Sequence, residues 1–207
     1  MKFLIFCCCL ILISHSGIAH PTSKWIQFVN SPKINYKNII ASTKISAEQG
    51  EPESQFQLGL YYFNGEKVVK DNLKAEFWYK KAAVQGNLKA QNNLSLMYFN
   101  GEGVEKNSCK GFYWINKAVN QGFDIAQYNL GLEYLHGEDT PNDSKQAVFW
   151  MQKAAEQGYS PAQYNLALIY YRGEIVPKDL EKAAFWARKA AAKGDYQAKI
   201  ILHLLRK

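Results

Sequence analysis

The sequence predicts an all-α solenoid, in which pairs of helices stack on one another along the chain. Two observations support this fold class. Similar residues recur every 36 positions through most of the 207 residues, and apolar positions within each copy follow the spacing of an α-helix. Glycine marks the end of each copy and keeps the interval throughout, at Gly50, Gly86, Gly122, Gly158 and Gly194.

The repeat keeps its length over four complete copies. We place them at 51–86, 87–122, 123–158 and 159–194, with no insertion between them. Three large residue types each hold one position: Trp78, Trp114, Trp150 and Trp186; Leu58, Leu94, Leu130, Leu166 and Leu202; and Tyr62, Tyr98, Tyr134 and Tyr170. Such periodicity indicates units that cannot bury their apolar faces alone and must stack on their neighbours.

The first element is a predicted signal peptide over residues 1–19. A basic Lys2 precedes an apolar run of 11 residues, and small residues at Gly17 and Ala19 suit a cleavage site. The run is short for a transmembrane helix, so retention as an anchor is the weaker alternative. We expect cleavage after Ala19, a leader over 20–33, and export to the periplasm or out of the cell.

Capping helices are predicted at both ends of the array. Residues 34–50 are similar to a second helix, because they end in Ala-Glu-Gln-Gly as the copy ending at Gly158 does. Residues 195–207 are similar to a lone first helix, with Ala198 and Leu202 in register. Repeat arrays need such ends. No other segment approaches membrane-spanning length, so we expect no integral membrane segment in the mature chain.

Each copy predicts two helices joined by a short loop, as 159–194 illustrates. Leu166 and Tyr170 belong to a first helix of helical periodicity, and Pro177 prevents its continuation. Asp179 then stands where an N-cap belongs, followed by an alanine-rich second helix that Gly194 closes. The small alanine side chains allow neighbouring helices to approach closely.

The string AQYNLALIYYRGEIVPKDLEKAAFWARKAAAKG, from Ala162 to Gly194, resembles the Sel1-like repeat, a 36-residue relative of the tetratricopeptide repeat. The resemblance covers about residues 34–207. It implies a right-handed α-solenoid of helix-turn-helix repeats whose first helices line a concave face. It also implies a non-catalytic adaptor or scaffold that binds a protein or peptide. For exported bacterial members, the resemblance implies work in envelope processes or in contact with host cells.

A candidate peptide-binding groove lies on the side of the first helices opposite their alanine and leucine positions. Amide side chains both donate and accept, so a row of them suits the backbone of an extended peptide, and aromatic side chains supply apolar contact. The predicted groove residues are Gln57, Asn93, Asn129 and Asn165; Phe56, Asn92, Tyr128 and Tyr164; and, toward the helix ends, Phe63, Phe99, Leu135, Tyr171, His136 and Arg172. The alternative is that the amides only solvate this face or bond between repeats.

Other recurring residues favour structural roles. Glu66, Glu102, Glu138 and Glu174 occur once per copy. Stacked helices lie about 8–10 Å apart, too far for a glycosidase pair or a metal site, so we assign the glutamates to loops. The four tryptophans predict a core stripe, because each buries a large apolar area. His20 has no neighbouring histidine that would complete a copper site. We therefore expect no metal or cofactor.

The competing hypothesis is a cell-wall-directed hydrolase of the β-lactamase-like branch of such proteins. That chemistry needs Ser-x-x-Lys together with Lys-Thr-Gly, and neither string occurs in the sequence. Gly-x-Ser-x-Gly and His-Glu-x-x-His are absent as well. The sequence thus predicts a protein without enzymatic activity.

Charge and cysteine content narrow the choice of partner. The net charge is +7, but the lysines are scattered along the chain and export separates it from nucleic acid. We therefore expect no nucleic-acid partner. Of four cysteines, only Cys109 remains after signal cleavage, so no internal disulfide is available and packing must stabilise the fold. We expect a monomer, with a disulfide-linked dimer through Cys109 as the alternative.

Overall fold

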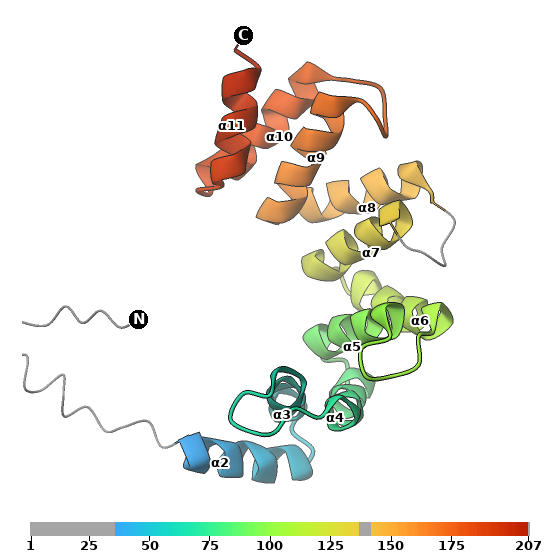
Figure 1. Ribbon diagram of the computed structural model, residues 1–207, viewed down its shortest axis with the longest axis vertical. Coiled ribbons are helices and arrows are strands. Elements are labelled where there is room, and N and C mark those ends of the chain that lie inside the picture. The colour runs from blue at the N-terminus through green and yellow to red at the C-terminus, as the bar shows by residue number, and fades with distance from the viewer. Residues whose placement is uncertain (1–35, 137–141, 207) are drawn as a thin grey trace, which may run out of the picture. The chain divides into compact units, whose positions relative to one another are not determined.

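The computed structural model describes residues 36–136 and 142–206, and within these ranges the chain forms ten helices and no strand. The predicted signal peptide (1–19) and leader (20–33) lie outside the described residues. Each helix packs against the next one along the chain, as Figure 1 shows for α2 to α11. The prediction of an all-α solenoid of stacked helix pairs is confirmed.

The four copies each contain two helices of 13 residues. The first helices are α3 (Pro52–Asn64), α5 (Leu88–Asn100), α7 (Asp124–His136) and α9 (Ser160–Arg172). The second helices are α4 (Asn72–Val84), α6 (Ser108–Asn120), α8 (Ser144–Glu156) and α10 (Leu180–Ala192). At the ends, α2 (Tyr36–Glu48) packs on α3, and α11 (Tyr196–Leu204) packs on α10 and α9.

Polar caps start the second helices where the sequence predicts them. The Asp179 carboxylate accepts a hydrogen bond from the backbone N–H of Lys182 at 2.9 Å, and Asn107 caps α6 in the same way. The backbone N–H of Asp179 also donates to the carbonyl of Tyr170 at 3.0 Å. The N-cap residue therefore starts one helix and ties the loop to the preceding one.

Glycine ends both helices of the copy. Gly173 follows α9 with a φ of 71°, and its N–H donates to the carbonyl of Ile169 at 3.0 Å. Gly194 lies one residue past the cap of α10 with a φ of 93°, as the sequence predicts. Both residues adopt left-handed backbone conformations that side chains with a Cβ disfavour.

The core combines large aromatic residues with very small ones. Trp78, Trp114 and Trp186 are buried, and Trp150 is partly buried, so the prediction of a tryptophan core stripe is confirmed. Alanines from the second helices are fully buried between them: Ala75, Ala82, Ala118, Ala147, Ala154, Ala155, Ala183, Ala187 and Ala190.

A ladder of buried glutamines links consecutive repeats, and the sequence did not predict it. Its members are Gln55, Gln91, Gln127 and Gln163, one on each first helix. Gln91 donates from Nε2 to the carbonyl of Ala83 at 3.0 Å, and its Oε1 accepts from Gln121 at 3.1 Å. The Gln91 side chain therefore bonds to the end of α4, the second helix of the preceding copy, and to Gln121 at the end of α6, the second helix of its own copy.

The last copy departs from this arrangement, because Lys193 stands where the other copies carry glutamine. Its Nζ contacts the carbonyl of Gly158. In the third copy, Gln157 reaches both the carbonyl of Gly122 at 3.0 Å and Oε1 of Gln127 at 2.8 Å. Within the described residues, Oε1 of Gln163 is buried without a hydrogen-bond partner.

Candidate functional site

Four depressions lie between consecutive first helices, and we call the surface that holds them the first-helix face. They lie between α3 and α5, α5 and α7, α7 and α9, and α9 and α11. A leucine at one repeat position borders every depression: Leu60, Leu96, Leu132 and Leu168. Leu96, Leu132 and Leu168 each border two of them. The result is a row of similar sites at the repeat interval.

This leucine ladder was not among the predicted site residues. Leu60 follows the core residue Leu58 by two positions, and the same pair recurs in every copy. Leu58 is buried, whereas Leu60 is only partly buried because it lies at the edge of the depression. The sequence does contain the signal, because a second leucine recurs in every copy two residues after the core leucine. It was not recognised because both leucines look like core positions.

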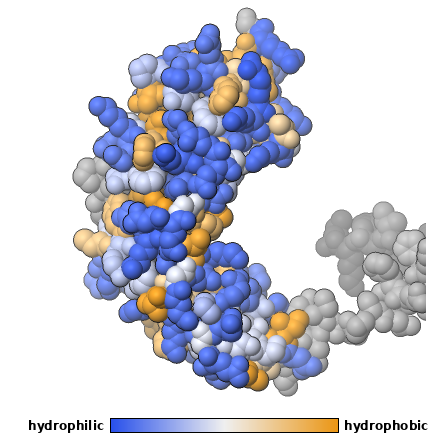
Figure 2. All heavy atoms as spheres, turned by 180° about the vertical axis from the view of Figure 1, so that it is seen from behind, coloured by the Kyte–Doolittle hydropathy of each residue, from blue (hydrophilic) through white to orange (hydrophobic). Residues whose placement is uncertain are grey.

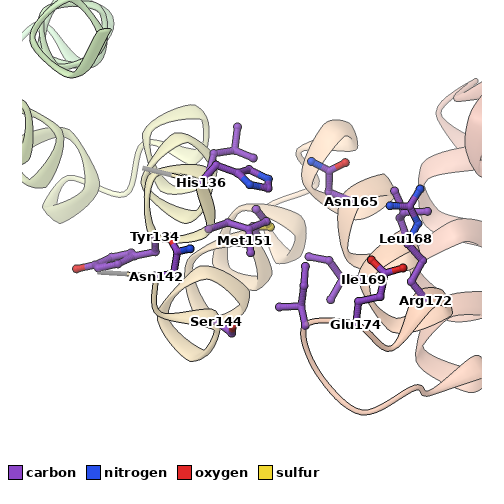
Figure 3. A pocket seen from close by; sticks show the side chains of 13 residues that line it. Tyr134, His136, Asn142, Ser144, Met151, Asn165, Leu168, Ile169, Arg172 and Glu174 are labelled. Atoms are coloured by element: carbon purple, nitrogen blue, oxygen red, sulfur yellow. The ribbon is translucent and has the colours of Figure 1, made fainter. Parts of the chain in front are cut away.

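The depression between α7 and α9 has a volume of about 440 Å³. Figure 3 shows His136 from α7 on one side of it and Asn165 and Arg172 from α9 on the other. Met151 and Ile169 also line it and are buried. The site thus offers apolar contact together with an exposed guanidinium group and a partly buried amide, a combination that suits the side chains of a bound polypeptide.

The predicted amide row bonds partly between repeats. Asn129 donates from Nδ2 to Oδ1 of Asn92 at 2.8 Å, and Asn165 donates from Nδ2 to the hydroxyl of Tyr128 at 2.8 Å. Asn93 and Gln57 are partly buried. Asn129 and Asn165 each use one N–H in these bonds, so their carbonyl oxygens keep the capacity to accept. The carbonyl oxygen of Asn93 already accepts from Nδ2 of Asn92 at 3.3 Å. Peptide binding by this row stays a prediction.

The predicted aromatic positions do not form a continuous exposed row. Phe56 and Phe99 are buried, and so is Asn92. Phe56 stacks on Tyr79 with ring centroids 5.8 Å apart, and Phe99 packs edge-on against Phe112 at 5.1 Å. These three residues serve the core. The partly buried members, which border the surface, are Phe63, Tyr128, Tyr164, Leu135 and Tyr171.

A missing Cβ explains why Phe99 enters the core. Gly111 occupies a position that is alanine in the other three copies. A Cβ placed on Gly111 would come within 2.5 Å of the Phe99 ring. The ring therefore fills the space that alanine takes elsewhere, while Phe99 still lines the depression between α5 and α7.

Two tyrosines near this face, Tyr128 and Tyr79, have raised pKa values. Burial raises the pKa of Tyr128, and the neighbouring Tyr159 adds to this, while the hydrogen bond from Asn165 opposes it. Burial likewise raises the pKa of Tyr79 to about 12, against a smaller opposing hydrogen bond from Asn93. Arg172 and Glu174 supply charged side chains to the α7–α9 depression.

The described residues hold no cluster that suggests a metal site. No group of three or more His, Cys, Asp or Glu side chains gathers among them. Glu66, Glu102 and Glu174 are exposed in the loops after the first helices, whereas Glu138 lies outside the described residues. Cys109 is exposed on α6. Across the described part of the chain, no helix has the length and apolarity needed to cross a membrane.

Stacked helix pairs with one row of depressions define a helical repeat protein. The Sel1 repeat matches residues 52–87, 88–123, 124–159 and 160–195, one residue later than the boundaries placed from the sequence. The chain therefore belongs to the Sel1 repeat family, whose repeats generally mediate interactions between proteins and are typically non-catalytic. No curated protein matches the chain.

Solved structures show the same fold. The chain is similar to a protective antigen of uropathogenic Escherichia coli with an SLR fold, at 36% identity and a TM-score of 0.70, over 77% of this chain and 34% of that one. It is also similar to a Sel1 repeat protein from Oxalobacter formigenes, at 37% identity and a TM-score of 0.68, over 80% and 48%. The match thus spans about a third to a half of these proteins.

An immunity protein from Pseudomonas aeruginosa matches at lower identity. It is 26% identical with a TM-score of 0.56, and the match covers 89% of this chain and 70% of that one. The array of helix pairs is therefore shared by proteins with different descriptions. The fold alone does not identify the partner, and the function must be argued from the faces of this chain.

Proposed function

We propose that this chain is an exported, non-catalytic scaffold that binds a protein partner through its first-helix face. The observation that carries the proposal is the row of four depressions between consecutive first helices, each bordered by a leucine at one repeat position. A repeated row of apolar sites suits an extended polypeptide, which presents side chains at regular intervals.

The spacing supports this geometry. Packed helices lie about 8–10 Å apart. An extended segment in the polyproline II conformation has three residues per turn and advances about 3.1 Å per residue, so every third side chain of the partner would meet successive sites. Leucines provide apolar contact, and the carbonyl oxygens of Asn129 and Asn165 accept hydrogen bonds from the backbone of the partner. Arg172 can pair with an acidic side chain of the partner at the α7–α9 depression.

The cellular setting is part of the proposal. The predicted signal peptide supports export with cleavage after Ala19, which would place the scaffold in the periplasm or outside the cell. The likeness to a protein described as a protective antigen of uropathogenic Escherichia coli supports a role in the envelope or in contact with host cells. Cell fractionation tests export, and recovery of the chain in the cytoplasmic fraction alone would contradict it. N-terminal sequencing tests cleavage, and a product that starts at Met1 would contradict cleavage after Ala19.

Binding through this face is tested by capture from envelope and host-cell extracts. The face variant is His136→Ala/Arg172→Ala on the first helices. The control is Gln152→Ala/Arg188→Ala on the second helices. The side chains of all four residues are exposed in the structure. We expect wild type and control to retain a partner that the face variant loses about tenfold or more. Equal retention of the partner by all three proteins would contradict binding through the first-helix face.

The hydrolase alternative makes a different prediction. It requires turnover of a peptidoglycan or β-lactam substrate, abolished by one side-chain substitution. Nothing in the geometry of the described residues favours it over binding. Incubation of the purified chain with both substrate classes tests it, and measurable turnover would contradict the scaffold proposal.

A further inference from the structure

A second repeated surface lies on the second helices, away from the first-helix face. One aromatic residue per copy is about half exposed at the same repeat position: Phe77 at 51%, Tyr113 at 56%, Phe149 at 48% and Phe185 at 47%. Four residues later, on the same side of each helix, stands an exposed lysine: Lys81, Lys117, Lys153 and Lys189. We call these eight residues the aromatic–lysine ladder.

The units of the ladder have nearly the same geometry. Each aromatic ring packs edge-on against the tryptophan that follows it, with ring centroids 4.9–5.0 Å apart in all four copies. The lysine Nζ lies 4.7–5.7 Å from the centroid of the exposed ring. Each copy therefore presents an apolar ring and an ammonium group together, supported by a tryptophan.

Positive charge is concentrated on these helices. The four second helices contain ten lysine or arginine residues and three glutamates, a net charge of +7. The first helices α3, α5, α7 and α9 contain two basic and three acidic residues, a net charge of −1. The second helices are therefore strongly basic and the first helices nearly neutral, a difference that the net charge of the whole chain does not show.

The ladder lysines differ from those at the helix starts. Lys74 and Lys182 form ion pairs with the N-cap residues Asp71 and Asp179, at 2.8 and 3.1 Å. Among the described residues, the ladder lysines enter none of the recorded ion pairs. Their charge therefore remains available to an anionic partner.

Exposed aliphatic residues add to the apolar character of the same helices. Leu73 and Val84 on α4 are each 67% exposed, and Leu180 on α10 is 47% exposed. Figure 2 shows hydrophobic residues interspersed with hydrophilic ones over the stack. Aromatic, aliphatic and lysine side chains together are typical of helices that lie at a membrane interface.

We propose that the aromatic–lysine ladder docks on the surface of an anionic phospholipid bilayer. The rings would enter the boundary between headgroups and acyl chains, while the lysines extend to the phosphates. The near identity of the four units favours this partner, because a bilayer presents the same chemistry to every repeat.

The experiment measures vesicle binding by the full chain. All proteins carry Trp25→Phe, so that emission comes from the four tryptophans beneath the ladder. Vesicles contain phosphatidylglycerol with or without brominated acyl chains, or phosphatidylcholine alone. The ladder variant is Lys81→Gln/Lys117→Gln/Lys153→Gln/Lys189→Gln. The matched control removes four exposed lysines elsewhere, as Lys44→Gln/Lys89→Gln/Lys178→Gln/Lys199→Gln.

A second variant tests the rings. Phe77→Ser/Phe149→Ser keeps every charge, and circular dichroism verifies that each protein is folded. We expect brominated lipid to quench tryptophan emission of wild type and control on anionic vesicles only. The ladder variant should bind about tenfold or more weakly than the control, and the ring variant should lose most of the quenching.

Three outcomes would overturn the proposal. Equal binding by the ladder variant and the control would assign the attraction to other parts of the chain, such as the apolar run near the N-terminus. Absence of quenching in wild type would remove the rings from the bilayer. If the chain bound poly-glutamate through the ladder but did not bind vesicles, the partner of the ladder would be an acidic polypeptide and not a bilayer.

Discussion

At the residue scale, the repeats solve one packing problem with different pairs of side chains. Gly59 on α3 faces Tyr79 on α4, and a Cβ on Gly59 would come within 2.6 Å of that ring. The equivalent pair in the last copy is Ala167 and Ala187, both fully buried. A large residue on one helix is thus matched by a small one on its partner, so the spacing between helices is kept although the residues differ.

Gly59→Ala should therefore destabilise the fold by about 1–3 kcal/mol, because the added methyl group meets a fixed ring. The control is the same change in a Tyr79→Ala background, which recreates the alanine pair of the last copy. There the added methyl group should be neutral or stabilising. Denaturant unfolding of the four proteins measures the coupling, and equal costs in both backgrounds would refute the volume argument.

Lys193→Gln should stabilise the protein by about 1 kcal/mol, because it supplies the donor that Oε1 of Gln163 lacks. Gln157 shows that glutamine at this position reaches both acceptors. Lys193→Met, which has no donor, serves as the control and should not stabilise. Thermal unfolding distinguishes them, and equal melting temperatures for Gln and Met variants would contradict the role given to the glutamine ladder.

Among the helices, the carboxylates that cap the N-termini of α4 and α10 make the stability of the fold depend on pH. Hydrogen bonds from Lys182, through its backbone N–H and then its side chain, lower the pKa of Asp179. The side chain of Lys74, followed by its backbone N–H, lowers the pKa of Asp71. A carboxyl with a lowered folded-state pKa stabilises the fold above its unfolded value, here near 3.8, and this stabilisation is lost as pH falls through the folded value.

Asp71→Asn/Asp179→Asn tests this linkage, because asparagine caps helices but does not ionise. Wild type should lose more stability than the variant as pH falls from about 5 to about 2. Melting temperatures measured across that range provide the comparison. Parallel pH dependence in both proteins would show that the two carboxylates do not contribute.

The helices were predictable from the sequence because their signals are local. Asp179 as an N-cap and Gly194 past a helix end follow from backbone chemistry, and a fixed period makes each copy support the others. The side-chain environments were less predictable. Gln91 is polar yet buried, since two neighbouring helix ends supply its partners. Phe99 is buried because Gly111, distant from it in sequence, leaves space for its ring.

At the scale of the whole molecule, stability depends on contacts between consecutive repeats. Trp114 is buried in one core cluster with residues from the first two copies, among them Tyr79 and Leu94. Trp114→Ala should lower the free energy of unfolding by about 3–5 kcal/mol and should weaken neighbouring repeats as well. Hydrogen exchange of α4 and α6 measures this spread, and loss of protection in α6 alone would contradict it.

The two proposals assign different roles to the two faces of the molecule. The first-helix face holds the depressions of the proposed partner site, and the second helices hold the proposed membrane contact. The sequence predicted a candidate site on the first helices, because the side of these helices opposite their alanine and leucine core positions must border the surface. The leucine ladder was not recognised, because Leu132 and Leu168 resemble core leucines until the depressions beside them are known.

Site-specific photocrosslinking in living cells can show whether a partner protein binds the first-helix face. A benzoylphenylalanine is placed at Leu132 or Leu168 on the first-helix face, and at the exposed Gln152 on α8 as the control. The account predicts one protein adduct shared by the two leucine positions and absent from Gln152. An adduct formed only at Gln152, or equally at all three positions, would contradict binding through the first-helix face.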